Sequence, residues 1–262
     1  REAGIDLPVI FVGRVNSKAD VDRLQHEMGA EYIAVGRELV ADPDFVGKYL
    51  GSVGGAVRPC LACAEGCLGG VKSGKGLQCV VNPLAGRESE GEFEEELVAP
   101  DAAKKYAVVG GGPAGMQAAL TLKQRGHQVE LFEKERLGGQ FSLAALPPNK
   151  QSLNELVDYY HGQIKAHKVP VHCEEATVEK IESGGFDGAL IATGAEPMVP
   201  PIKGLKEYSW TEFLYDQHLP EHTRVLIIGG GLIGMELASK LVDRDNHVIV
   251  VEMLPEVRNS RG

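Results

Sequence analysis

Apolar and polar positions alternate in blocks along the chain, and the blocks predict strands that alternate with helices. Apolar runs at 8–15 and 32–39 predict two strands, each with a Gly-Arg pair near its end. Between them, apolar residues recur at helical spacing over 17–28, where Ser17 is a suitable N-cap and Asp20 its capping-box partner. A strand–helix–strand unit with short connections is typical of a parallel sheet or of part of a barrel.

A later block occurs twice. Residues 107–133 match residues 226–252 without a gap, at a shift of 119 positions (226 − 107) and with ten of 27 residues identical. Each copy predicts a strand, a glycine-rich turn, an amphipathic helix and a second strand, so the repeat indicates two copies of one nucleotide-binding unit. Between the copies, the pattern predicts a helix at 151–167, short strands near 169–173 and 176–181, and a buried strand at 187–194.

The turn in each copy has glycines at G-x-G-x-x-G spacing. In dinucleotide-binding units the first glycine permits a tight turn, the second lets the backbone approach a pyrophosphate, and the third lets the helix pack closely on the strand. A glutamate ends the second strand of each copy, where it can accept hydrogen bonds from a ribose diol. The first copy supplies Gly110, Gly112, Gly115 and Glu133, and the second supplies Gly229, Gly231, Gly234 and Glu252.

The second copy carries a hint about its cofactor and one local departure. The Glu252 carboxylate suits a free ribose 2′-hydroxyl and repels a 2′-phosphate, so NADH is favoured, although Arg258 is near enough in sequence to leave NADPH open. Gly126, expected to end the first helix in the left-handed conformation, is replaced by Asp245 before Asn246. Because asparagine tolerates that conformation, we expect the turn to survive.

Four of the five cysteines fall close together, with the spacing C-x2-C-x3-C-x11-C: Cys60, Cys63, Cys67 and Cys79. Four thiolates in a glycine-rich loop can hold an iron–sulfur cluster or a zinc ion, and free thiols are the third possibility. The spacing favours [4Fe–4S], because zinc ribbons usually show two C-x2-C pairs. Cys173 stands alone and is expected to be a small buried apolar residue.

Composition and charge exclude some classes of function. The 262 residues carry a formal net charge of −10, which argues against a general nucleic-acid binder. No apolar run is long enough for a transmembrane helix and no signal-peptide pattern is present, so a cytoplasmic setting without membrane contact is expected. Six glutamates within 88–96 predict a solvated linker and a domain boundary. Nothing in the sequence indicates the oligomeric state.

Together these segments resemble one flavoenzyme family, which contains 2,4-dienoyl-CoA reductase, 2-enoate reductase and trimethylamine dehydrogenase. The cysteine segment RPCLACAEGC with the later CVVNP, preceded by VGR and AVGRELVADPDF, is similar to the end of that family's barrel and its cluster segment. The segments VVGGGPAGMQAAL, LGGQF and IATGAEP resemble its FAD (or ADP) domain, and the sequence leaves open which of the two nucleotides binds there. The segment IIGGGLIGMELA resembles its nicotinamide domain. The match is best to the branch of enoate reductases and NADH:flavin oxidoreductases.

The resemblance implies an α/β architecture in four parts. These are the last two strands of an FMN-binding TIM barrel at 1–58, a [4Fe–4S] segment at 59–98, an FAD-binding domain at 99–221 and the start of an NAD(P)H-binding domain at 222–262. The two nucleotide-binding domains would be Rossmann-like and of the disulfide-reductase type. Electrons would pass from NADH through FAD and [4Fe–4S] to FMN, for reduction of an activated C=C bond in an enoate-like small molecule.

The resemblance also implies roles for individual residues. The four clustered cysteines would ligate the iron–sulfur cluster. The phosphate of FMN would lie at the ends of the last two barrel strands, held by Gly13, Arg14, Gly36 and Arg37. The residues expected to touch FAD are Gly110, Gly112, Gly115, Glu133, Gln140 and Thr193. Those expected to bind NADH are Gly229, Gly231, Gly234 and Glu252.

Members of this family are far longer than this chain, which we therefore expect to be a fragment truncated at both ends. Residues that face the substrate belong to earlier barrel strands, so neither substrate nor catalytic residues are identified, and the chain alone is expected not to reduce a C=C bond. Two alternatives stay open. One is an amine dehydrogenase relative without NADH, which Glu252 disfavours. The other is a zinc-stabilised nucleotide-binding module without catalysis, which metal analysis would distinguish.

Overall fold

The computed structural model describes residues 7–90, 100–205, 210–215 and 218–255. The chain divides into two compact units. The first comprises Arg1–Lys105, Ala119–Val129 and Asp158–Val169, and the second comprises Tyr106–Ala118, Glu130–Val157 and Pro170–Gly262. Most of the predicted linker at 88–96, and Arg258, lie outside the described residues. None of the helices in the described ranges has the length and apolar character that a membrane span requires.

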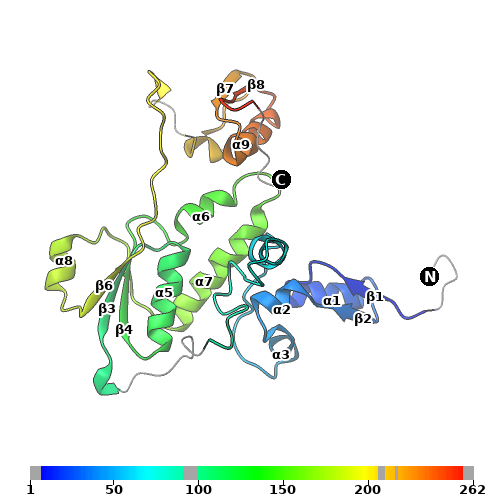
Figure 1. Ribbon diagram of the computed structural model, residues 1–262, viewed down its shortest axis with the longest axis vertical. Helices are drawn as coiled ribbons and strands as arrows, with labels where there is room; N and C mark the ends of the chain where they lie inside the picture. Colours follow the sequence, from blue (N-terminus) through cyan, green and yellow to red (C-terminus); the bar gives the residue numbers. More distant parts are fainter. Residues whose placement is uncertain (1–6, 91–99, 206–209, 216–217, 256–262) are drawn as a thin grey trace. The chain divides into compact units, whose positions relative to one another are not determined.

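The amino-terminal part of the first unit is the predicted strand–helix–strand motif (Figure 1). Its elements are β1 (Ile10–Val12), α1 (Lys18–His26), β2 (Tyr32–Ala34), α2 (Arg37–Ala41), α3 (Phe45–Leu50), the π-helix η1 (Glu65–Gly69) and α4 (Gly70–Lys72). β1 and β2 pair in parallel. Helix α1 begins with the predicted capping box: the Asp20 N–H donates to the Ser17 hydroxyl over 3.1 Å, and the Ser17 N–H donates to the Asp20 carboxylate over 3.0 Å.

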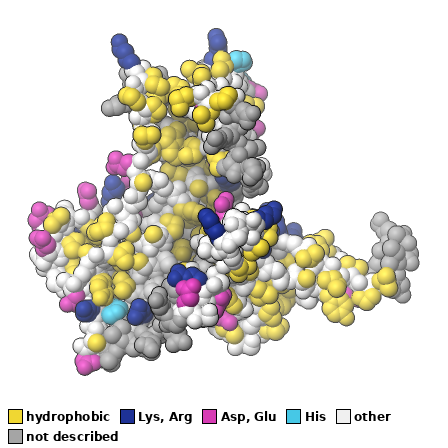
Figure 2. Space-filling model, in the orientation of Figure 1, with side chains coloured by type: hydrophobic (Ala, Val, Ile, Leu, Met, Phe, Trp, Pro, Cys, Tyr) yellow, Lys and Arg dark blue, Asp and Glu magenta, His cyan; other side chains and the backbone are white. Residues whose placement is uncertain are grey.

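The second predicted strand is shorter than the pattern indicated. Its apolar run extends over 32–39, but the backbone leaves the extended conformation at Gly36 and residues 37–41 form α2. A small core of Val15, Val21, Leu24 and Phe45 holds this part together. The other sides of the strands are uncovered: Ile10, Val12 and Tyr32 are 65%, 72% and 59% exposed, and Figure 2 shows apolar side chains on the surface there.

The first repeat and the segment between the two repeats build a four-stranded sheet in the order β5-β4-β3-β6. Its elements are η3 (Pro100–Ala102), β3 (Lys105–Val109), α5 (Pro113–Gln124), β4 (Gln128–Phe132), α6 (Gly139–Ala144), η4 (Gln151–Leu153), α7 (Asn154–Ala166), β5 (Val171–His172), α8 (Val178–Ser183) and β6 (Gly188–Ile191). The pairs β3–β6 and β4–β5 are parallel. Val108, Met116 and Leu131 are fully buried, so the strand–turn–helix–strand prediction is confirmed.

Three local predictions in this region were wrong. The segment 176–181 is not a strand but the start of α8, because the Thr177 hydroxyl accepts the Lys180 N–H and caps a helix. The strand predicted as buried, β6, lies at an edge of the sheet, so its Ile191 is 67% exposed. Cys173, expected in a core, is exposed at the end of β5.

The second repeat forms a smaller copy of the same motif. Strands β7 (Arg224–Ile228) and β8 (His247–Val251) pair in parallel, and α9 (Leu232–Val242) packs on both. A short 3₁₀ helix, η6 (Glu212–Leu214), precedes them. The core consists of Leu219, Ile227, Leu237, Ala238 and Leu241. The predicted repeat is thus confirmed at the level of secondary structure in both copies.

Candidate functional site

The four clustered cysteines line one small cavity in the first unit. All four are half-buried and unpaired by disulfides. Two non-glycine residues between Cys60 and Cys67 adopt left-handed backbone conformations, Ala62 with φ 53° and Ala64 with φ 60°. Such conformations are disfavoured for alanine. They turn the chain sharply twice, so that the early cysteines face the same cavity.

Gly66 explains how the distant Cys79 joins the other three. The carbonyl of Gly66 accepts the N–H of Gln78 over 3.1 Å. A Cβ atom at Gly66 would lie 2.8 Å from the Gln78 carbonyl carbon and oxygen, too close for any side chain. This close backbone contact aligns Cys67 and Cys79, which directly follow the two contacting residues. The long x11 spacing is therefore closed by a glycine within the motif.

Four thiols around one cavity are a donor set that a [4Fe–4S] cluster or a single zinc ion can take. Zinc takes four thiolates at about 2.3 Å around one centre, whereas each iron of a [4Fe–4S] cluster takes one thiolate, so that its ligands lie farther apart. Across the described residues, no three His, Cys, Asp or Glu side chains converge where one metal ion could bind. The cluster itself stays a prediction.

Helix α2 anchors the cysteine loop through two adjacent charged residues. The buried Glu38 carboxylate accepts the backbone N–H of Cys60 over 2.9 Å, and the Arg37 guanidinium donates to the carbonyl of Ala62 over 3.4 Å. The Asn16 amide donates to the Cys60 carbonyl over 3.0 Å. Burial raises the pKa of the Cys60 thiol, and the charge of Glu38 adds to this while that of Arg37 opposes it.

The residues proposed for the FMN phosphate follow the two strands of the amino-terminal motif. Gly13 and Arg14 come directly after β1, with φ of 128° and 45°, and Gly36 and Arg37 follow β2. Because the strands are parallel, both pairs lie at the same edge, where barrel enzymes bind phosphate. Arg37 also lines the cysteine cavity, which the sequence did not indicate. Phosphate binding here stays a prediction.

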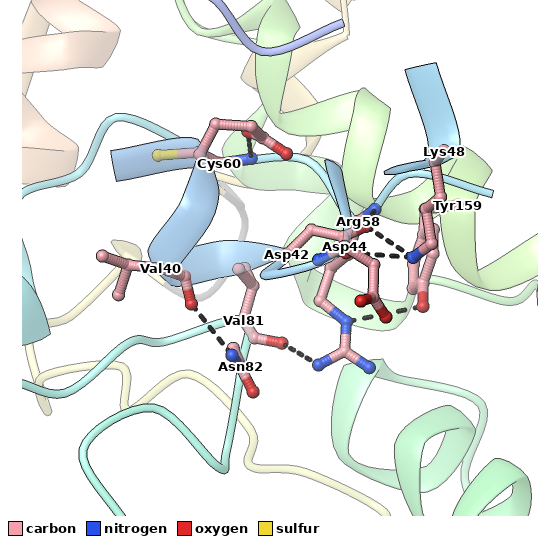
Figure 3. A network of polar contacts seen from close by, with 10 residues as sticks. Val40, Asp42, Asp44, Lys48, Arg58, Cys60, Val81, Asn82 and Tyr159 are labelled. Carbon is pink, nitrogen blue, oxygen red and sulfur yellow. Dashed lines mark hydrogen bonds and ion pairs between the residues drawn. The ribbon is translucent and has the colours of Figure 1, made fainter. Parts of the chain in front are cut away.

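A buried polar network lies beside the cysteine segment, in the first unit (Figure 3). Asp42, whose side chain is 4% exposed, forms an ion pair with Lys48 at 2.7 Å and accepts the N–H of Arg58 over 2.8 Å. The Arg58 guanidinium donates to the Val81 carbonyl at 3.1 Å and lies over the ring of Tyr159, on α7, at 5.6 Å. Arg58 thus connects the residues around the cysteine loop to α7.

The glycine turn of the first repeat has the geometry that its motif predicts. Gly110 has φ 109°, and a Cβ there would meet the Ala192 carbonyl oxygen at 2.2 Å. A Cβ at Gly115 would meet the Gly110 carbonyl oxygen at 1.8 Å, so the helix can approach the strand only without a side chain. A Cβ at Gly112 would meet no atom within 4 Å. The open position is the one expected to face a pyrophosphate.

A cavity of about 470 Å³ opens at this turn within the second unit. Volumes of this size are typical of small-molecule and cofactor sites. Five of the six predicted FAD residues line it: Gly110, Gly112, Glu133, Gln140 and Thr193. The Gln140 side chain donates to the carbonyl of Ala195. Arg136, which the sequence analysis missed, also lines the cavity and donates to the Tyr215 hydroxyl over 2.5 Å. The structure thus places most of the predicted FAD residues together.

The second glycine turn repeats the first. Gly229 has φ 109°, and a Cβ at Gly234 would meet the Gly229 carbonyl oxygen at 2.0 Å, whereas one at Gly231 would meet nothing within 4 Å. Glu252 accepts the N–H of Gly230 over 2.7 Å. Backbone hydrogen bonds from Leu254 and Gly230 lower the pKa of Glu252, so the carboxylate is ionised at neutral pH. An ionised carboxylate at this position disfavours a 2′-phosphate.

The left-handed turn expected after α9 is present, but a different residue from the predicted one adopts the left-handed conformation. Asp245, not Asn246, takes the left-handed conformation, with φ 56°. The buried Asn246 side chain instead donates to the carbonyls of Leu241 and Pro220 over 2.9 and 2.7 Å and accepts the N–H of Thr223 over 3.1 Å. It therefore satisfies the carboxyl end of α9 and fixes the entry to β7.

Comparisons with known proteins show which families and enzymes this chain resembles. Residues 104–261 match the family described as pyridine nucleotide-disulphide oxidoreductase. An NADH oxidase of Thermoanaerobacter brockii is 38% identical over 97% of this chain, and a cinnamate reductase of Clostridium sporogenes is 35% identical over 98% of it. A 2-naphthoyl-CoA reductase in complex with 2-naphthoyl-CoA superposes over 95% of the chain with a TM-score of 0.86 at 28% identity.

The chain belongs to the pyridine nucleotide-disulphide oxidoreductase family, among the enoate and dienoyl reductases that its motifs resemble. It spans about 40% of the length of these relatives, with 40%, 38% and 38% covered in the three cases. The predicted family and its class of oxidoreductases are therefore confirmed.

Proposed function

We propose that the chain is the electron-delivering part of an NADH-dependent iron–sulfur flavoenzyme that reduces an activated C=C bond in an enoate-like substrate. When bound, the cofactors would supply a route from NADH through FAD and [4Fe–4S] to FMN. The observation that carries the proposal is that four cysteines line one cavity in a chain that also has two nucleotide-binding glycine turns. Relatives named NADH oxidase and cinnamate reductase support an NADH-linked reductase.

Each part of the chain has a defined task in this proposal. Residues 1–58 would be the end of an FMN-binding barrel, 59–98 the cluster segment, 99–221 the FAD domain and 222–262 the start of the NADH domain. The parallel β1–α1–β2 motif with its uncovered apolar side chains is consistent with two strands of a larger barrel. Gly13, Arg14, Gly36 and Arg37 would hold the FMN phosphate by backbone N–H groups and guanidinium donors.

The residues of the chain bind and orient the cofactors. Gly110, Gly112 and Gly115 would let the amino end of α5 approach the pyrophosphate of FAD, and Glu133 would orient its ribose. Gly229, Gly231, Gly234 and Glu252 would do the same for NADH. The cysteine thiolates would fix the cluster in a half-buried loop. The amine dehydrogenase alternative is not better supported, because the ionised Glu252 suits NADH.

The decisive experiment is anaerobic purification, with iron, zinc, acid-labile sulfide and flavin measured per chain. We expect about four irons and four sulfides, together with bound FAD. The variant Cys67→Ser should lose iron and sulfide, while Cys173→Ser, which changes an exposed cysteine outside the cavity, should keep both. One zinc without sulfide would refute the electron-transfer proposal and support a structural metal site. Equal iron loss in the two variants would show that the cavity does not hold the cluster.

A further inference from the structure

We propose that the adjacent residues Arg37 and Glu38 set the reduction potential of the cluster at the cysteine cavity, in opposite directions. Arg37 would raise the potential and Glu38 would lower it. The inference rests on the proposed function, because it requires a cluster at these cysteines. It adds that α2 regulates the cluster, in addition to any role of Arg37 toward a phosphate.

The position of Arg37 carries the first half of the argument. Arg37 lines the cavity that the four cysteines line, and its guanidinium donates to the carbonyl of Ala62, between the first two cysteines. Arginine stays charged at any accessible pH. Reduction adds one electron to the cluster, with no bond broken and no proton required. A fixed positive charge beside the cavity stabilises the more negative, reduced state and therefore raises the potential.

The position of Glu38 carries the second half. Its carboxylate accepts the backbone N–H of Cys60 over 2.9 Å, and the residue is only 2% exposed. Because water is excluded there, an ionised Glu38 acts on the neighbouring thiolates more strongly than a surface charge would. A negative charge opposes the arrival of an electron.

The two residues are neighbours in sequence, and both project toward one loop because they occupy the first turn of α2, directly after β2 and Gly36. A structural role alone would need only their hydrogen bonds to the loop backbone, and neutral side chains could supply these. The pairing of opposite charges against one half-buried loop is what points to control of the potential. Net charge and hydrogen bonding around the sulfurs are general determinants of cluster potentials.

The test is a potentiometric titration of the anaerobically reconstituted full chain, followed by electron paramagnetic resonance of the reduced cluster. The variants are Arg37→Gln, Arg37→Lys and Glu38→Gln. We expect a shift to lower potential in Arg37→Gln, a smaller shift in Arg37→Lys, and a shift to higher potential in Glu38→Gln. Arg23→Gln, which alters an exposed guanidinium paired with Asp20 on α1, is the control and should keep the wild-type potential.

Iron and sulfide content separates the possible failures. Absence of iron and sulfide from the wild-type chain would refute the proposed function itself. Variants with full iron and sulfide content but unchanged potentials would refute the present inference alone, as would shifts of the same sign in Arg37→Gln and Glu38→Gln. Loss of iron from both Arg37 variants would also overturn it, by showing that Arg37 only holds the loop.

Discussion

Glu133 and Glu252 make the same pair of hydrogen bonds at equivalent positions of the two repeats. One carboxylate oxygen of each accepts the N–H of the residue that directly follows the first motif glycine. The distances are 2.6 Å from Gly111 and 2.7 Å from Gly230. The other oxygen accepts the N–H two residues further along, over 2.8 and 2.9 Å. Each glutamate is therefore oriented by its own turn before any ribose arrives. This preorganisation lowers the entropic cost of binding a nucleotide.

The first prediction concerns Glu252→Gln. The amide cannot accept hydrogen bonds with both terminal atoms, and it no longer repels a phosphate. We expect NADH affinity to fall about 10–100-fold, the range for a charge-assisted hydrogen bond worth roughly 1.5–3 kcal/mol, and the preference for NADH over NADPH to weaken. Fluorescence titration with both nucleotides would measure this. The control is Glu221→Gln, which removes an exposed carboxylate paired with Arg244 in the same part of the chain.

The pH dependence of NAD⁺ binding follows from the same carboxylate. Hydrogen bonds from Leu254 and Gly230 hold the pKa of Glu252 below the ordinary value of 4.5. The Glu252 carboxylate contributes to NAD⁺ affinity only while it is ionised. This contribution disappears as the pH falls through its lowered pKa. The Glu252 contribution should therefore be constant across neutral pH and decline only in acid below 4.5. An affinity difference between wild type and Glu252→Gln that changes between mildly acidic and neutral pH would contradict this assignment.

A pair of glycine variants separates folding from cofactor binding. In Gly234→Ala the new Cβ would meet the Gly229 carbonyl oxygen at 2.0 Å, so the helix must move. The cost is expected near 1–3 kcal/mol, as for other overpacked sites. In Gly231→Ala the Cβ meets nothing within 4 Å and φ is −74°, so stability should be unchanged while the methyl group blocks the pyrophosphate. Thermal denaturation and NADH titration would show opposite rankings; equal stability of the two variants would contradict the close approach.

Breaking the network around Asp42 should destabilise the first unit. Asp42→Asn leaves the Lys48 ammonium, on a side chain 14% exposed, without its ion-pair partner. Removing one member of a buried pair typically costs about 3–5 kcal/mol. Urea denaturation would measure the loss. As a control, Tyr159→Phe removes only a hydroxyl 3.4 Å from Arg58 and keeps the ring beneath the guanidinium, so it should cost little. A loss for Asp42→Asn as small as that for Tyr159→Phe would show that the network is not a structural anchor.

The sequence predicted the parts of the structure that depend on local chemistry. The two glycine turns, the capping box at Ser17 and the alternation of strands and helices all follow from spacing within a few residues. The predictions failed where distant contacts decide. Burial of β6 depends on its position at the sheet edge, and the fate of residues 176–181 depends on Thr177 as a helix cap. An apolar run alone indicates neither the position of a strand within its sheet nor the presence of a helix cap.

The same division applies to the candidate sites. The cysteine spacing identified the four thiols as a candidate site. Their common cavity follows from left-handed backbone conformations at Ala62 and Ala64, which residue propensities do not predict. Glu38 and Arg58 carried no signal in the sequence, because each binds the cysteine segment through a backbone group more than 20 residues away. The glycine at position 66 was an available signal for the loop closure. Its spacing, however, does not indicate which segment it approaches.

The last prediction exploits a difference between the two repeats. Gly126 and Asp245 occupy equivalent positions with positive φ, 94° and 56°. A left-handed conformation costs a residue with a Cβ roughly 1–2 kcal/mol, somewhat less for aspartate, and costs glycine nothing. Asp245→Gly should therefore stabilise the second repeat by about 0.5–1 kcal/mol, and Gly126→Asp should destabilise the first by a similar or larger amount. Thermal denaturation of both variants would measure these changes.

Asp243→Gly, at a neighbouring residue with φ −63°, is the control and should destabilise the chain, because glycine only adds unfolded-state entropy there. If Asp245→Gly lowers the stability as much as Asp243→Gly does, the left-handed turn is not the source of strain.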